Sequence, residues 1–254
     1  MSIDGGNTDD SVDWPFEQRL ALLNGLTDAS RLIELGMDEL HAVDGANEST
    51  HPLLHLLSHG FERLVKYTLF LAMSAQNAAP PDAKYMKDLS HDIENALVDL
   101  LALVSPDPEY ADRPAAALDL DFMRNDPDLK RLLALLSRFG KLDRYYDLNV
   151  LIDAKAAELT MDPSAEWKEI EDDFVFRIPG ALDAIASDPT AASRLLIQAN
   201  RDIAAVLDRF HRCLTRMWFW GALGPEGPAT ATSVLWKVNV LNDDDLGLPR
   251  PPAS

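Results

Sequence analysis

The sequence predicts an all-α protein. Apolar residues recur with helical periodicity through most of the 254 residues, while the alternating pattern of strands is nearly absent. Three Asp-Pro pairs, at 126–127, 162–163 and 188–189, each place a helix-capping side chain before a proline suited to the first helical turn. With 47% apolar and 26% charged residues, the chain has the composition of a globular protein and can bury a sizeable core.

We expect one helical domain over residues 14–223, preceded by a disordered segment, 1–13, and followed by a C-terminal extension with a Pro-rich tail, 224–254. Prolines and glycines divide the domain. The expected helices cover residues 14–43, 52–75, 83–104, 127–159, 163–176, 179–187 and 189–223.

Some boundaries within these helices leave alternatives. Asn24-Gly25 is a candidate break in the first helix, and Gly140 is expected to bend or end the fourth. Residues 109–126 are expected to form a loop with at most a short helix. The helices on either side of Pro80-Pro81 are joined by a short loop, so they should pack as an antiparallel hairpin.

The extension contains one segment with strand periodicity. Val234, Trp236, Val238 and Val240 alternate with the residues between them, which predicts one short strand. A lone strand needs a partner, so this segment would pack as an extended arm or pair across a dimer.

Charge and cysteine content narrow the function. The net charge of −19, from 42 acidic and 23 basic residues, opposes binding to phosphate backbones, so we expect no DNA partner, although a local basic patch could still bind RNA. The single cysteine, Cys213, excludes an intramolecular disulfide and a zinc ribbon. There is neither a basic leader nor a long uncharged apolar run, so we expect a cytoplasmic protein without a membrane partner.

One face of the second expected helix carries titratable groups. His51, His55, His59, Glu62 and Lys66 fall within an arc of about 80° on the helical wheel. The histidines could be a solvated or interface-facing stripe, or the ligands of a metal-dependent hydrolase. The first and third lie about 12 Å apart along the axis, too far to share one ion, so we expect no metal and no cofactor.

This helix and the next carry a family resemblance. Glu62 and Lys66, four residues apart, are followed after a loop by a helix that opens with His91-Asp92. Over about residues 50–105 this arrangement resembles the HEPN superfamily, the higher eukaryotes and prokaryotes nucleotide-binding domains. Arg144-Tyr145-Tyr146 is also similar to a helical element of some HEPN-like proteins. The resemblance implies a HEPN-like helical bundle built on an antiparallel helix hairpin. From the residues themselves we expect Glu62, Lys66, His91 and Asp92 to form a buried or interhelical polar network that holds this hairpin.

The last long helix carries a line of arginines. On the wheel they lie within about 80° of one another, opposite the apolar face. These residues are Arg194, Arg201, Arg209, Arg212 and Arg216. They form either an RNA- or phosphate-binding surface or the acid-paired polar face of an amphipathic helix.

HEPN ribonucleases carry an arginine followed after four to six residues by a histidine on this helix, and this chain lacks that pair. Two hypotheses follow. One is a non-catalytic HEPN-like protein that acts through association, as a homodimer or with a protein partner, in a bacterial stress or phage-defence system. The other is a divergent metal-independent ribonuclease, in which His59 or His91 replaces the missing histidine and works with Arg201.

Overall fold

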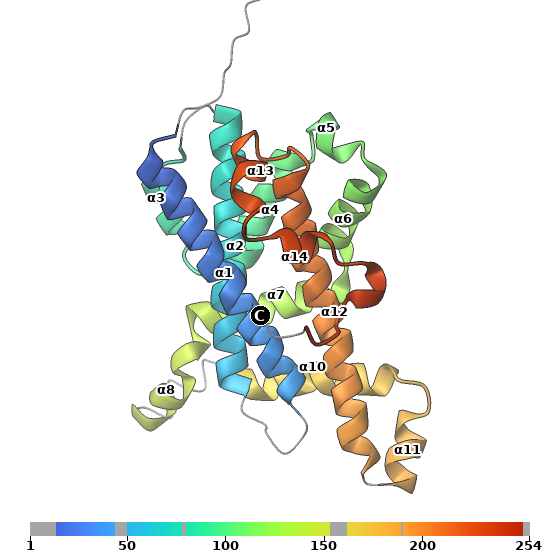
Figure 1. Ribbon diagram of the computed structural model, residues 1–254. Coiled ribbons are helices and arrows are strands. Elements are labelled where there is room, and N and C mark those ends of the chain that lie inside the picture. Colours follow the sequence, from blue (N-terminus) through green and yellow to red (C-terminus); the bar gives the residue numbers. More distant parts are fainter. Residues whose placement is uncertain (1–13, 44–49, 78–79, 153–161, 189, 251–254) are drawn as a thin grey trace, which may run out of the picture.

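The computed structural model describes residues 14–43, 50–77, 80–152, 162–188 and 190–250. Within these residues the chain forms helices and no strand, so the all-α fold class is confirmed (Figure 1). The predicted disorder of residues 1–13 and the last four residues of the Pro-rich tail lie outside the described residues.

In chain order the helices are α1 Phe16–Ala42, α2 Thr50–Asn77, α3 Ala83–Asp88, α4 Ile93–Val104, α5 Pro108–Ala111, α6 Pro114–Asn125, α7 Pro127–Lys141, η1 Asp143–Tyr145, α8 Tyr146–Ile152, α10 Pro163–Arg177, α11 Ala181–Ser187, α12 Ala191–Phe219, α13 Glu226–Ala231, α14 Trp236–Asn239 and η2 Asp243–Asp245.

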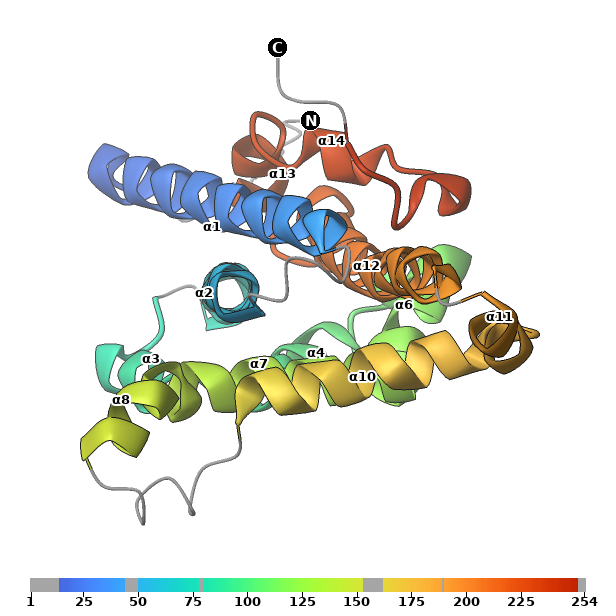
Figure 2. The ribbon, with the colours of Figure 1, turned by 90° about the horizontal axis from the view of Figure 1, so that it is seen from below.

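Helix α2 is the centre of the fold. It packs against α1, α4, α7, α10 and α12, and Figure 2 shows it end-on between α1 on one side and α7 and α10 on the other. A helix surrounded in this way must be apolar on several faces. Leu53, Leu57, Phe61 and Leu64 are accordingly fully buried. The few polar side chains of α2 that turn inward therefore require partners.

Helices α1 and α2 approach closely because glycines lie at their contact. A Cβ atom added at Gly60 would lie 2.9 Å from the backbone nitrogen of Ile33. One added at Gly25 would overlap the ring of Tyr67. Helix α1 continues unbroken through Gly25, so the candidate break at Asn24-Gly25 is wrong. This glycine accommodates a neighbouring side chain and does not end the helix.

Two of the three Asp-Pro helix starts are confirmed. The side chain of Asp126 accepts a hydrogen bond from the backbone N–H of Leu129, and that of Asp162 accepts one from Ser164. The third differs, because α12 begins only at Ala191. Asp188 instead accepts from the backbone N–H of Thr190, and its neighbour Pro189 lies outside the described residues.

The prediction of one helix over residues 83–104 is wrong. The chain forms α3 and α4 there, separated at Ser90, whose φ of 47° lies in the left-handed region. Asp92 then caps α4 by accepting from the backbone N–H of Asn95 at 3.0 Å. A left-handed non-glycine residue is uncommon and costs about 1 kcal/mol or more, so the sequence gives no signal for this turn.

Two further predictions need correction. Residues 109–126 hold α5 and α6 almost throughout, because Pro114 opens a second helix whose Leu120 and Met123 reach the core. The predicted strand over residues 234–240 is a turn followed by α14, with Val238 buried. A strand there would have no neighbour to pair with in the described chain, whereas a helical turn satisfies its own backbone groups.

The extension after α12 folds back onto the bundle. Ala231 and Leu235 are fully buried in the same core as α1 and α12. Beyond them, buried Asp208 of α12 accepts from the backbone N–H of Gly247 and from the guanidinium of Arg250, while buried Arg212 bonds Asp243. Among the described helices, none is both long enough and apolar enough to cross a membrane.

Candidate functional site

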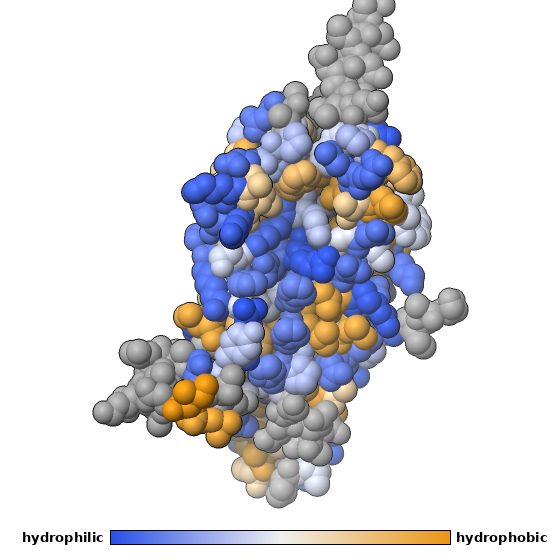
Figure 3. Space-filling view, turned by 90° about the vertical axis from the view of Figure 1, so that its left-hand side faces the viewer, coloured by the Kyte–Doolittle hydropathy of each residue, from blue (hydrophilic) through white to orange (hydrophobic). Residues whose placement is uncertain are grey.

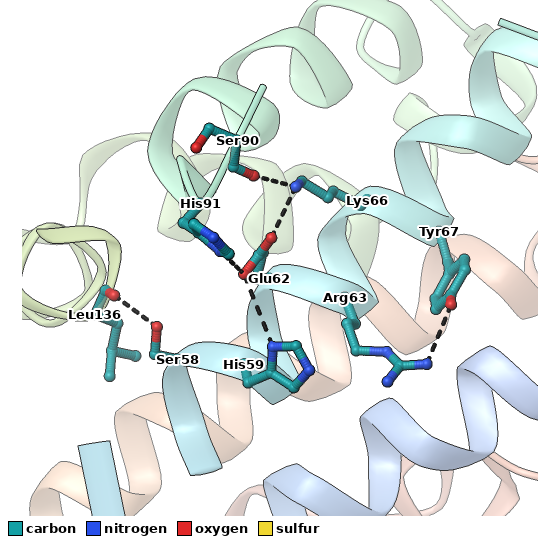
Figure 4. Close-up of polar contacts among 9 residues, drawn as sticks. All are labelled: Ser58, His59, Glu62, Arg63, Lys66, Tyr67, Ser90, His91 and Leu136. Atoms are coloured by element: carbon teal, nitrogen blue, oxygen red, sulfur yellow. Dashed lines mark hydrogen bonds and ion pairs between the residues drawn. The ribbon is translucent and has the colours of Figure 1, made fainter. Parts of the chain in front are cut away.

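The buried carboxylate of Glu62 joins α2 to the α3–α4 turn (Figure 4). Its Oε1 accepts from Nζ of Lys66 at 2.7 Å, and its Oε2 lies 2.7 Å from Nδ1 of His91. The ammonium of Lys66 also donates to the backbone carbonyl of Ser90. The left-handed turn at Ser90 thus presents both its carbonyl and the adjacent imidazole to α2.

Asp92 lies beside this cluster and bonds elsewhere. It caps α4 and pairs with Lys141 at the end of α7, and the Lys141 and Asn95 donors hold the pKa of its carboxyl below the ordinary value despite partial burial. The sequence groups Asp92 with Glu62 and Lys66, whereas the structure gives it its own partners on α4 and α7. The two sets together tie α2, α4 and α7 at one end of the bundle.

A pocket of about 140 Å³ opens over Glu62. His59 and His91 both line it, together with Arg144 from η1. His59 is about half exposed, and its burial lowers the pKa of the imidazole, outweighing the attraction of Glu62. A carboxylate on Nδ1 orients an imidazole and leaves Nε2 for proton transfer, so His91 has the arrangement of a general acid or base.

Helix α7 forms the opposite wall of the pocket and is held close to α2. The hydroxyl of Ser58 donates to the backbone carbonyl of Leu136 at 2.7 Å. A Cβ atom at Gly140 would lie 2.9 Å from that hydroxyl and 3.2 Å from Cβ of His91. Helix α7 ends one residue later, at Lys141, which confirms the predicted role of Gly140 as a break. The close approach explains why a glycine stands there.

The remaining histidines of α2 contact aromatic rings. His51 lies 5.1 Å from the ring of Phe139, and His55 stacks on His59 at 6.3 Å. Nε2 of His51 is 3.2 Å from the backbone oxygen of Arg144. Within the described chain, no three His, Cys, Asp or Glu side chains are grouped so that they could hold a metal ion.

The five arginines of α12 have different surroundings. Arg194 pairs with Asp188 at the exposed start of the helix, and Arg216 donates to both oxygens of buried Asp119 at 3.0 Å. Arg212 is buried and donates to Asp243 and to the backbone oxygen of Leu241. For these three arginines the structure therefore shows the acid-paired polar face of an amphipathic helix, the second of the two interpretations of the arginine line.

The other two arginines do not meet at a common surface. The guanidinium of Arg209 lies 4.1 Å from the ring centre of Phe122, and it shares a pocket of about 370 Å³ with Arg212 and Arg216. Arg201 is exposed, and its charge acts on His41 of α1. His59 and His91 thus share one pocket, and Arg201 is not among the residues that line it.

The sequence anticipated the contact between Glu62 and Lys66 but not the cation opposite them. The sequence pointed to Arg144 only through the family resemblance. Its place in the same pocket as His91 depends on the turn at η1. Comparisons of this chain with family models, with curated proteins and with solved structures each gave no match. The HEPN resemblance therefore stays a prediction from the sequence.

Replacing Glu62 tests how much this cluster stabilises the fold. We expect Glu62→Gln to lower the free energy of unfolding by about 2 kcal/mol, because it leaves Lys66 and His91 partly buried without their counter-charge. Urea unfolding at neutral pH measures this loss. Lys84→Gln, which removes a largely exposed pair with Asp88, should change stability by less than about 0.5 kcal/mol. Equal effects of the two changes would contradict the structural role of Glu62.

Proposed function

We propose that this chain is a non-catalytic HEPN-like protein that acts by association with a second copy of itself. The HEPN-like assignment is supported by the packing of α2 against α4 and by the contacts among Glu62, Lys66 and His91, three of the residues on which the resemblance rests. A bacterial stress or phage-defence setting follows only from the family and is part of the same proposal.

The observation that carries the proposal is the apolar surface around α8. Figure 1 shows this helix projecting from the body of the molecule, and it packs mainly on η1. Leu151 and Ile152 are 83% and 75% exposed. On the face shown in Figure 3, apolar side chains form separate patches within a largely hydrophilic surface. The exposed apolar residues of this segment are Leu142, Tyr145, Val150, Leu151 and Ile152.

Exposed apolar patches of this kind mark contact surfaces. Burying a leucine or isoleucine contributes about 1.5 to 3 kcal/mol, so two of them account for roughly 100-fold or more in affinity. A second copy of the chain supplies the same apolar segment, so a two-fold symmetric contact would bury the apolar segments of both copies against each other.

Sedimentation velocity tests the association. We expect the wild-type chain to sediment at twice its mass of 28.1 kDa and the Leu151→Asp, Ile152→Asp double variant to be monomeric. Leu182→Asp, at a comparably exposed position on α11, is the control and should remain a dimer. A monomeric wild type, or a double variant that still dimerises, would reject the association through α8.

The pocket over Glu62 favours a second candidate function, metal-independent RNA cleavage. Its specific support is His91, oriented by Glu62 and facing the same pocket as His59 and Arg144. An imidazole near neutral pKa and a fixed cation are the groups such cleavage needs. The acidic charge of the chain and the pairing of Arg212 and Arg216 oppose it.

Incubation of purified protein with a mixed RNA pool in EDTA separates the two functions. Under the first proposal we expect no cleavage. Cleavage that is lost in His91→Ala and in Arg144→Ala, and kept in Arg201→Ala, would replace it with the second. Cleavage that survives all three substitutions would indicate a contaminating nuclease.

A further inference from the structure

A basic pocket lies between α6, α12 and η2 and shares no lining residue with the site over Glu62. Its volume is about 370 Å³, within the range of small-molecule sites. Three arginines from successive turns of α12 line it, namely Arg209, Arg212 and Arg216. The chain has a net charge of −19, but a bound ligand responds mainly to charges within the Debye length of about 8 Å. These arginines can therefore attract an anion.

Arg209 is the cation of this pocket that lacks an acidic partner. Within the described residues it forms neither an ion pair nor a hydrogen bond, and its guanidinium lies 4.1 Å from the ring centre of Phe122 on α6. Stacking on an aromatic face holds a guanidinium in place and leaves its in-plane N–H donors for other groups. The side chain is half-buried, and none of its nitrogens is both buried and without a partner. Its donors are therefore accessible to a ligand.

Arg216 has one side free. Its Nη1 donates to both oxygens of buried Asp119 at 3.0 Å, and its guanidinium lies 5.2 Å from the ring centre of Trp220. A guanidinium has five N–H donors, so this pairing leaves Nε and Nη2 without a partner in the described chain. Neither nitrogen is closed off from solvent. Arg216 is thus fixed through one edge and can bind an anion through the other.

An acid of the chain already lies against these arginines. The side chain of Asp243 is 85% exposed, yet it accepts a hydrogen bond from Arg212. That hydrogen bond, together with the charges of all three arginines, holds the pKa of its carboxyl below the ordinary value. Three guanidiniums thus act on one exposed carboxylate. With Asp119 as the second acid, the pocket lining carries three positive and two negative charges, an excess of one positive charge.

We propose that this pocket binds a small organic phosphate, a phosphomonoester, through Arg209 and the free side of Arg216. Such a phosphate carries a charge of about −1.5 to −2 near neutral pH, and its three acceptor oxygens fit the paired N–H donors of guanidiniums. The organic group lies against Leu118 and Leu246, which line the pocket beside the arginines. A nucleic-acid backbone would extend beyond the pocket, where the acidic chain repels it. This site is independent of the association surface on α8.

Isothermal titration calorimetry at constant ionic strength and pH 7.5 tests the proposal with phenyl phosphate. Phenol shares its ring, and inorganic phosphate shares its charged group. We expect phenyl phosphate to bind saturably, at least about tenfold more tightly than phenol and about threefold more tightly than inorganic phosphate. Absence of saturable binding, or an equal affinity for either comparison ligand, would overturn the proposal. A single-stranded RNA of ten nucleotides that bound more tightly than phenyl phosphate would replace the small ligand with RNA.

Four variants locate the site. Arg209→Gln should weaken phenyl phosphate at least about tenfold, whereas Arg124→Gln, which removes an exposed arginine of α6 outside the pocket, should not change its affinity. Asp243→Asn removes a negative charge from the lining and should tighten binding severalfold.

Leu118→Glu adds a carboxylate at a 64% exposed position of the pocket and should weaken binding, which tests the site even if Arg209→Gln fails to fold. Affinity that is unchanged in Arg209→Gln or in Leu118→Glu, or reduced in Asp243→Asn, would reject this location.

Discussion

Gly60→Ala is expected to lower the free energy of unfolding by about 3 kcal/mol, although alanine is the better helix former. The added Cβ atom would lie 2.9 Å from the backbone nitrogen of Ile33 and 3.2 Å from the backbone oxygen of Ala29. Backbone atoms cannot rotate away as the end of a side chain can, so α1 and α2 must separate. Because α2 is the central helix, that separation loosens the contacts on both sides of it.

Chemical denaturation of Gly60→Ala beside Gly25→Ala measures this effect. The atoms nearest to a Cβ atom at Gly25 all belong to the far end of the half-buried Tyr67 side chain, which can shift more readily than backbone, so its cost should be smaller. If Gly60→Ala unfolded within about 0.5 kcal/mol of the wild type, helix propensity would outweigh the contact and the close approach of α1 and α2 would be wrong.

The stability of the fold should also depend on the protonation of His211. This side chain is fully buried on α12, against the ring of Phe61, and neither ring nitrogen has a hydrogen-bond partner among the described residues. Burial, assisted by the charge of Arg250, lowers its pKa from 6.5 to about 3. The unfolded chain therefore takes up a proton below about pH 6.5 that the folded chain takes up only near pH 3.

Stability rises with pH wherever the unfolded state binds more protons, so this histidine destabilises the fold as the pH falls from about 6.5 toward 3. The loss is about 1.4 kcal/mol per pH unit, or roughly 4 to 5 kcal/mol over the whole interval. Asp208 and Glu171 act in the opposite sense, because burial raises the pKa of both carboxyls. The contribution of His211 must therefore be read from a difference between two variants.

His211→Leu provides that difference. At neutral pH we expect it to be as stable as the wild type or more so, because it removes two buried nitrogens without partners. Between pH 6 and 4 the unfolding free energy of the variant should fall less steeply than that of the wild type. The two slopes should differ by up to about 1.4 kcal/mol per pH unit, which is the effect of one proton. If urea denaturation gave parallel curves of stability against pH for the wild type and His211→Leu, then His211 would bind its proton in the folded chain as it does in the unfolded chain.

The sequence predicted helices well where side chains close to the backbone decide their boundaries. Asp126-Pro127 and Asp162-Pro163 begin α7 and α10 because the aspartate accepts from the helix's own N–H groups. The turn at Ser90 and the helical turn over residues 236–239 depend instead on distant contacts. Lys66 of α2 holds the first, and burial of Val238 fixes the second.

The same distinction applies to the candidate site. Glu62 and Lys66 are one helical turn apart, so their contact follows from helix geometry alone. The alignment of the arginines on α12 was also predictable, but their partners Asp119 and Asp243 lie on α6 and η2. Helical periodicity shows which side chains share a face, and only the tertiary fold shows what opposes that face.

The buried charges of α12 have a consequence for the order of events during synthesis. Asp208 bonds Arg250, 42 residues further along the chain, and Arg212 bonds Asp243, 31 residues further. At about 5 to 20 residues per second, a ribosome needs roughly 2 to 8 s to make the longer of these stretches. Until its own partner is made, each of these ions would be unpaired if α12 docked on the bundle, so the final packing of α12 should wait for translation of the segment that neutralises them.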